Sequence, residues 1–279
     1  MHFIHAIWLG IRRRPLAFGT EIFLAYSALW TVVESASFFL SEIKLQGRLY
    51  YLTLMGTASL IATIRAYQRR AIKFRVGHSN TTIAVYFGDL FQSGGYQAIP
   101  VNEYFDSELG LPVSPKSLHG MVIDRFFGGH PASFDQLITK DLNGLSSQNV
   151  QRTSGKPLRY EIGTTAKVVT NSHRFLLFAL CTTELNTFKA SAGLPELVQG
   201  LGGLCTKARA VLGGEKLAVP LVGSGLSGIG LPSHHLLQLI ILLLVNETKK
   251  SQFALEIDIV LHPSRFDEID LQQIEGFWR

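Results

Sequence analysis

Two long apolar runs near the N-terminus constrain the fold of this chain more than any other feature. The first covers residues 16–40, with its most apolar window at 22–40, and the second covers residues 49–66. A helix crosses the hydrocarbon core of a bilayer with about 20 apolar residues. The polar link between the runs, residues 41–48, is too short to be a domain. The runs therefore predict a transmembrane helical hairpin within residues 1–70.

Basic residues indicate how such a hairpin would be oriented. They cluster at residues 12–14 and 65–75, whereas the link carries only Lys44 and Arg48. Because cytoplasmic segments hold the excess of Lys and Arg, we expect a multi-pass protein whose termini and soluble domain are cytoplasmic. A secretory or twin-arginine signal and a soluble helical hairpin are the alternatives. The length of the first run and its acidic Glu21 disfavour the signal, and the sparse polar face disfavours the soluble hairpin.

Glu34 is the unusual residue of the first run, because it falls in the expected hydrocarbon zone. An ionisable group there usually faces a protein interior, water or a partner. The second run carries small residues, among them Gly56 and Ala58, that let helices approach closely. Either the hairpin packs only on itself, or hairpins form a homo-oligomer in the lipid bilayer with Glu34 lining a polar path.

Composition limits the classes of partner and site. Apolar residues make up 47% of the chain and charged residues 17%, which favours a membrane component. The basic clusters flank apolar runs, so a membrane surface explains them better than nucleic acid, and we expect no nucleic-acid partner. Cys181 and Cys205 lack a zinc-binding spacing and suggest buried thiols in a reducing compartment. We expect no metal, no cofactor and no catalytic residue.

The remainder, residues 71–279, alternates short β-prone runs with helical patterns. We expect strands at 71–76, 81–87, 97–101, 158–162, 166–169, 174–181, 217–222 and 253–261, and helices at 116–127, 134–142, 194–212, 236–245 and 266–274. This alternation predicts an α/β domain whose mixed sheet is covered by helices on both faces.

A glycine-rich segment, residues 217–232, is the most distinctive motif of this second part. Its sequence, LAVPLVGSGLSGIGLP, predicts a buried strand, a loop with four glycines, and then a helix that Ser233 would cap. Such a loop exposes N–H groups beside a helix end, which is how many proteins hold phosphates. An ordinary strand-to-helix loop is the alternative, since neither a dinucleotide fingerprint nor a P-loop is present.

Three segments, in their order along the chain, resemble the macro domain, an ADP-ribose-binding three-layer α/β/α fold. They are IAVYFGDLF at residues 83–91, AIPVN at 98–102 and VPLVGSGLSGIGLP at 219–232. The resemblance covers residues 71–279. It implies that Asp89, with Leu90 beside it, accepts a hydrogen bond from the adenine amino group, and that Asn102 lies near the distal ribose.

The resemblance also implies where the diphosphate would lie. The second phosphate loop of the family corresponds to Gly223, Ser224, Gly225, Leu226, Ser227 and Gly228. In place of the glycine-rich first loop stands a divergent segment, Ser117, Leu118, His119 and Gly120, that opens an expected helix. Its N–H groups can still receive a phosphate.

Catalysis is not expected from the resemblance. Hydrolytic macro domains often carry another asparagine shortly after the first, whereas Glu103, Tyr104, Phe105 and Asp106 follow Asn102 here. Asp106 could act as a base, but nothing near it in the sequence marks it as one. We therefore expect a receptor. The alternatives are a membrane-anchored ADP-ribose hydrolase, a reader of ADP-ribosylated proteins, or a structural module with a vestigial pocket.

A membrane hairpin joined to a divergent macro domain resembles the membrane effectors of bacterial Thoeris anti-phage systems. The resemblance implies a location in the bacterial inner (plasma) membrane and a partner TIR enzyme. That enzyme would make a nucleotide signal from NAD, such as a histidine conjugate of ADP-ribose. Binding of this ADP-ribose derivative would trigger oligomerisation and membrane disruption.

Overall fold

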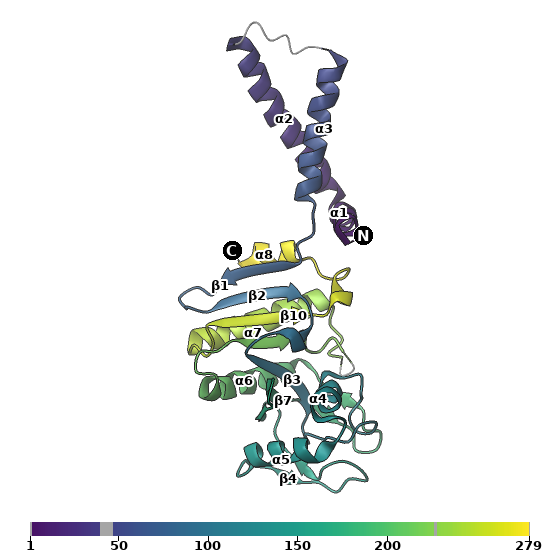
Figure 1. Cartoon of the computed structure of the whole chain (residues 1–279), viewed down its shortest axis with the longest axis vertical. Helices are drawn as coiled ribbons and strands as arrows, with labels where there is room; N and C mark the ends of the chain where they lie inside the picture. The colour runs from purple at the N-terminus through teal and green to yellow at the C-terminus, as the bar shows by residue number, and fades with distance from the viewer. Residues whose placement is uncertain (1, 40–46, 226–227, 279) are drawn as a thin grey trace. The chain divides into compact units, whose positions relative to one another are not determined.

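The chain divides into two compact units, Met1–Arg69 and Arg70–Arg279 (Figure 1). The computed structural model describes residues 2–39, 47–225 and 228–278. Most of the link expected at 41–48, and Leu226 and Ser227 of the glycine-rich loop, lie outside the described residues.

The first unit contains three helices, α1 (His2–Arg13), α2 (Pro15–Phe39) and α3 (Arg48–Arg65). α2 and α3 pack against each other, and α3 contributes the buried residues Leu54, Ala58 and Ala62, which follow one another at helical spacing. α2 has no buried residue. Within the described part of the chain, α2 is the one helix long and apolar enough to cross a membrane.

The expectation of two membrane spans is therefore supported for one helix only. The 25 residues of α2 extend about 37 Å at a rise of about 1.5 Å per residue, enough for a hydrocarbon core of about 30 Å. α3 has 18 residues, with Arg48 and Arg65 at its ends. The stretch between these arginines extends only about 24 Å.

The second unit is built on a mixed sheet with the strand order β1-β2-β10-β9-β3-β7-β6, and β8 pairs with β7 (Figure 1). Five neighbouring strands, β2, β10, β9, β3 and β7, run parallel, and β1 and β6 flank them antiparallel. The strands are β1 (Ala71–Arg75), β2 (Thr82–Phe87), β3 (Tyr96–Asn102), β4 (Gln148–Asn149), β5 (Leu158–Arg159), β6 (Thr165–Val169), β7 (Arg174–Thr183), β8 (Ala190–Ser191), β9 (Leu217–Pro220) and β10 (Glu256–Leu261).

Helices cover both faces of this sheet, which confirms the expected three-layer α/β/α fold. α4 (Leu118–Phe127) and α5 (Pro131–Leu142) share one core with the sheet, and α6 (Leu194–Val211), α7 (Ser233–Lys250) and α8 (Leu271–Trp278) share the other. The side chains of β7 contribute to both cores. Phe175 and Leu177 enter the first core, while Leu176 and Phe178 enter the second, because successive side chains of a strand point to opposite faces.

Three local predictions need correction. The expected strand 158–162 is only Leu158–Arg159, and it pairs with β4 in a separate small sheet. The expected helix 266–274 starts later, at Leu271, after a short 3-10 turn, Pro263–Arg265. Pro232, and not Ser233, occupies the N-cap of α7, and the Ser233 hydroxyl instead donates to Glu268 at 2.6 Å.

Candidate functional site

A cavity of about 830 Å³ lies at the carboxyl ends of the five parallel strands. It is bordered by Asp89 after β2, His262 after β10, the loop after β9, Asn102 of β3 and Cys181 of β7. Four inter-strand spacings of about 4.8 Å make this row of strand ends about 19 Å long. Ligands of open α/β sheets bind in this position, outside the carboxyl ends of the strands.

Asp89 and Leu90 lie together at one end of the cavity, and both line it. Asp89 is exposed, and its Oδ1 accepts from the Phe91 N–H at 3.0 Å, which starts the short 3-10 turn Leu90–Gln92. No protein donor reaches Oδ2 in the described part of the chain. Asp89 therefore presents one carboxylate oxygen to the cavity side, while Leu90 is buried in the core beneath.

The loop after β9 supplies N–H groups to the cavity. Gly223 has φ 80°, and a Cβ there would collide with the Ile229 side chain, so this position requires glycine. Among the described residues, no acceptor is bonded to the N–H groups of Gly223, Ser224 or Gly225. All three residues line the cavity.

Gly228 differs from the first half of this loop. Its N–H donates to the Gly225 carbonyl at 3.1 Å, and it lines an adjoining hollow of about 520 Å³ that lies beside the start of α7. The N–H predicted to hold a phosphate is thus occupied within the loop. Leu226 and Ser227 lie outside the described residues.

The divergent segment forms the N-terminus of α4, with Ser117 as its N-cap. Ser117 Oγ accepts from the Gly120 N–H at 2.9 Å and donates to the Ser114 carbonyl at 2.7 Å. Leu118 and His119, in the first turn, have N–H groups without an intrahelical partner and line the cavity with Ser117. Gly120 does not line it. A Cβ at Gly120 would collide with the Ser114 carbonyl, so this glycine serves close packing.

His119 is buried, and its Nε2 has no hydrogen-bond partner among the described residues. Desolvation, and then the charge of Lys156, lower the pKa of His119 to about 3. The imidazole is therefore neutral at pH 7. It can offer or accept a hydrogen bond, but it cannot supply a positive charge or act as a general acid.

Asn102 borders the cavity, but its side chain is bonded to Asp106. Its Nδ2 donates to Asp106 Oδ2 at 2.8 Å, and its Oδ1 accepts from the Asp106 N–H at 3.1 Å. Asp106 is fully buried and accepts two bonds of 2.9 Å from the Arg152 guanidinium and one of 2.7 Å from the Lys156 N–H. Asp106 is thus an anchor beneath the cavity, and not an accessible base.

Cationic side chains, which the sequence did not point to, surround the cavity. Four of them line it against a single carboxylate, Asp89: Lys116, Arg125, Lys189 and Arg265. Arg265 also donates to the Ser224 carbonyl at 2.9 Å, so it braces the glycine-rich loop, and it forms an ion pair with Glu268 at 2.8 Å outside the cavity lining. The four come from separate segments of the chain, and no local run of charge announces them. Together they favour an anionic ligand.

A family model described as "Thoeris protein ThsA, Macro domain" matches residues 83–262. The chain belongs to the ThsA macro-domain family. Its fold is similar to that of an Oceanobacillus iheyensis macrodomain with MES bound, at 12% identity and a TM-score of 0.50, over 76% of this chain and 98% of that chain. The same macrodomain "with ADP" gives 12%, a TM-score of 0.49, and coverage of 74% and 96%. A comparison with curated proteins gave no match.

The loop between β7 and β8 adds an aromatic residue to the cavity of this ThsA macro domain. Phe188 lines the cavity and has φ 55°, an uncommon conformation for a bulky side chain. The Arg152 guanidinium lies 5.7 Å from its ring centre. Backbone strain of this kind is often found at ligand sites. Phe188 is therefore, besides the cationic residues, another cavity residue that the sequence did not predict.

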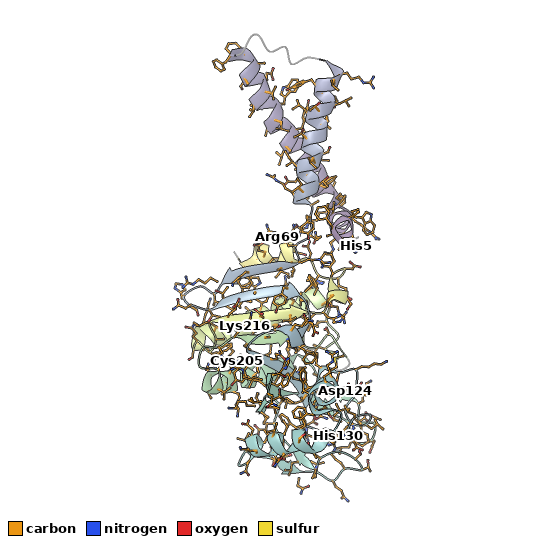
Figure 2. The ribbon with its side chains drawn as sticks, viewed as in Figure 1. His5, Arg69, Asp124, His130, Cys205 and Lys216 are labelled. Carbon is orange, nitrogen blue, oxygen red and sulfur yellow. The ribbon has the colours of Figure 1, made fainter. Side chains whose placement is uncertain are left out.

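Other residues considered in the sequence lie elsewhere in this ThsA macro domain. Phe266, the first residue of the helix expected at 266–274, is buried against Phe87 and Arg70. Cys205 belongs to α6 (labelled in Figure 2) and is buried in the core, and burial raises the pKa of its thiol to about 12. The described residues contain no group of three or more His, Cys, Asp or Glu side chains that could hold a metal ion.

Proposed function

We propose that this chain is a membrane-anchored receptor for an ADP-ribose-derived signal in Thoeris anti-phage defence. The single observation that carries the proposal is the composition of the cavity. It combines unbonded N–H groups of Gly223, Ser224 and Gly225, four cationic side chains, and one exposed carboxylate, Asp89. This combination fits a nucleotide with a diphosphate centre and an amino-bearing base.

The arrangement suggests how such a ligand would lie. Its diphosphate would bind between the 223–225 loop and the first turn of α4, because both segments line the cavity and have N–H groups that no described acceptor occupies. The base amino group would donate to Asp89 at one end. The distal ribose and its conjugate, such as histidine, would reach Asn102 and Phe188 at the other end, and the row of strand ends, about 19 Å long, accommodates this extended molecule.

A receptor is favoured over a hydrolase by the state of the polar side chains near the expected distal ribose. Asp106 is fully buried in its ion pair with Arg152, and both polar ends of Asn102 are bonded to Asp106. His119 is neutral and buried. None of these can take a proton from a water molecule at the distal ribose without prior rearrangement.

The membrane part of the proposal goes beyond the single helix α2. We place α3 as a second, shorter span, because its exposed residues include Leu52, Leu60 and Ile64. Five threonine hydroxyls of α2 and α3 bond to carbonyls within their own helix, as lipid-exposed hydroxyls must: Thr20, Thr31, Thr53, Thr57 and Thr63. The basic clusters at 12–14 and 65–75 would keep both ends cytoplasmic, at the inner membrane of a bacterium.

Signal transmission would proceed by assembly of hairpins. Glu34 is exposed on α2, which buries no residue, so this helix face is available to a second copy. The signal, made by a partner TIR enzyme, must bind the assembled state more tightly than the resting one. A complete switch needs a difference of about 10⁴-fold in affinity. Assembly around Glu34 would then disrupt the membrane.

Calorimetry on the full chain in lipid nanodiscs tests the proposal with ADP-ribose and its histidine conjugate as probes. Asp89→Asn is the sharpest variant, because Asn can still accept from the Phe91 N–H but presents an NH₂ in place of Oδ2. We expect affinity to fall about 10- to 100-fold, the value of a hydrogen bond to a charged group. Arg265→Gln should weaken binding less.

Lys140→Gln, an exposed change on α5 away from the cavity, is the matched control and should leave affinity unchanged. Equal affinities for Asp89→Asn and the unmodified chain would contradict the site. Release of free ADP-ribose from the conjugate, followed by chromatography, would instead favour the hydrolase.

A further inference from the structure

The N-terminal helix α1 has an unusual distribution of large and small side chains. The residues that pack against the rest of its unit include the small Ala6 and Gly10, together with Leu9. Its large apolar residues Phe3, Ile4 and Trp8 have relative exposures of 64%, 73% and 51%, and one side of the Phe3 ring stacks on Tyr67 with ring centres 5.4 Å apart. A helix of a water-soluble protein normally places its large apolar side chains inward.

The inward face of α1 is fixed by close contacts. A Cβ on Gly10 would collide with the Ala66 carbonyl oxygen just after α3, so only glycine permits this approach. Gln68 is buried, its N–H donates to the Ala6 carbonyl at 3.4 Å, and its Oε1 accepts from Arg13 at 3.1 Å. Because this face is fully used, the large outward residues cannot turn inward without breaking it.

The direction of α1 also differs from that of the membrane helix. Arg14 alone separates α1 from α2, and Pro15 opens α2 without an N–H, which interrupts the helical hydrogen bonding. Figure 1 shows α1 nearly end-on but α2 and α3 from the side, so α1 runs across the hairpin and not along it. Figure 2 shows side chains spread around α1, where His5 is labelled.

Charge completes the pattern. Residues 12–14 are all arginine and lie at the junction where α2 begins. The Arg12 guanidinium lies 5.0 Å from the Trp8 ring centre, so a cation and an amphipathic aromatic ring share one outward patch. Aromatic rings and arginines with this arrangement are typical of helices in the interface of a membrane that carries anionic headgroups.

We infer that α1 is an interfacial helix that inserts Phe3, Ile4 and Trp8 into the lipid surface beside the entry point of α2. Lipid is the occupant that the structure favours, because the apolar patch continues directly into the candidate membrane span and carries arginines for anionic headgroups. The inference rests on the proposed membrane insertion of α2. It adds a second lipid-binding element that would set the depth and tilt of the span.

The three tryptophans of the chain, Trp8, Trp30 and Trp278, allow a direct test, since Trp30 lies in α2 and Trp278 ends α8 of the other unit. Three single-tryptophan chains are made by Trp→Phe changes at the other two positions. Each is placed, one chain per nanodisc, in phosphatidylcholine with anionic phosphatidylglycerol, and fluorescence is measured with lipids brominated at shallow or deep acyl positions. A fourth chain adds Ile4→Asp to the Trp8 reporter.

We expect shallow bromine to quench Trp8 at least twofold more than deep bromine, whereas Trp278 should remain unquenched. Ile4→Asp should remove most of the Trp8 quenching. Quenching of Trp30 without quenching of Trp8 would overturn the inference and leave the span intact. Absence of Trp30 quenching would instead contradict the membrane insertion of α2. The quenching of Trp8 would then still show whether α1 contacts lipid. Quenching of Trp8 at one chain per disc that disappears at several chains per disc would assign the patch to a second copy and overturn the inference.

Discussion

Both units of the molecule are rich in large apolar side chains, but the second unit buries them and α2 of the first unit leaves them exposed. In the second unit, Phe175 and Phe178 are fully buried on the two faces of one strand. In the first unit, α2 buries none of its residues, and Phe23 and Val32 are each 67% exposed. The membrane insertion proposed for α2 accounts for this difference, because the hydrophobic effect drives apolar side chains inward only where water surrounds them.

Polar groups follow the same division. The second unit buries Asp106 and Arg152, but it compensates them with each other and with neighbouring N–H groups. In the first unit, the ion pair between Glu21 of α2 and Arg65 of α3 is exposed, and the threonine hydroxyls of α2 are bonded inside their own helix. The comparison thus makes predictions about where a new or unpaired charge is tolerated.

The largest effect is expected from charges placed on α2. Phe23→Lys with Val32→Lys puts charges on opposite sides of the helix, because nine residues correspond to about two and a half turns. Each central charge disfavours insertion by about 2.5 to 3.5 kcal/mol, so the pair should prevent it. Flotation with liposomes after alkaline extraction measures the retained fraction.

If α2 faced water, the same two exposed positions would accept lysine with little effect. Retention of the double variant in the floating fraction would therefore break the comparison. Lys249→Gln, an exposed change near the end of α7, serves as the control and should float like the unmodified chain.

The next effect is expected in the second unit, at the buried ion pair. Arg152→Met leaves the Asp106 carboxylate buried without its cation and should lower the free energy of unfolding by about 3 to 5 kcal/mol. Adding Asp106→Asn removes the stranded charge and keeps an oxygen for the Lys156 N–H, so part of the loss should return. Urea unfolding followed by near-ultraviolet circular dichroism measures both. If the double variant is no more stable than Arg152→Met, the unpaired Asp106 carboxylate is not the cause of the lost stability.

The smallest effect concerns His119 and pH. In the unfolded chain this histidine has a pKa near 6.5, whereas burial lowers the pKa to about 3 in the folded chain. The unfolded state therefore binds the extra proton between these values, and stability is full above pH 6.5 and falls as the pH decreases toward 3. At pH 5 the loss attributable to His119 should be about 2 kcal/mol.

His119→Leu should remove this part of the acid sensitivity, so the stability difference between pH 7.5 and pH 5 becomes smaller than in the unmodified chain. Urea midpoints at the two pH values provide the comparison. An identical pH dependence in both chains would indicate that His119 is not buried neutral.

The sequence predicted the parts of this architecture that depend on local patterns and strand order. Asp89, Asn102 and the 223–225 loop each follow a short apolar run, and parallel strands bring such positions to one edge of a sheet. The three-layer fold follows from the same alternation. The fold prediction is confirmed because strand and helix periodicities are properties of neighbouring residues.

The features that the sequence did not predict depend on contacts between distant residues, or on glycine and alanine, whose side chains are absent or small. Asp106 looked like a possible base, because nothing in the sequence shows that Arg152 would neutralise it. Lys189 and Arg265 reach the cavity from different loops, so no charge run identifies them. The sequence did not predict the α1 helix, because its buried face includes alanine and glycine, which contribute little to a hydrophobic periodicity.

A structure of the full chain bound to the histidine conjugate of ADP-ribose, in nanodiscs by electron cryomicroscopy, tests the central claim most directly. The account predicts that the diphosphate lies within hydrogen-bonding distance of the Gly223, Ser224 and Gly225 N–H groups, with the base amino group on Asp89. Ligand density outside this cavity, or a chain that binds the conjugate while these N–H groups remain unoccupied, would contradict it.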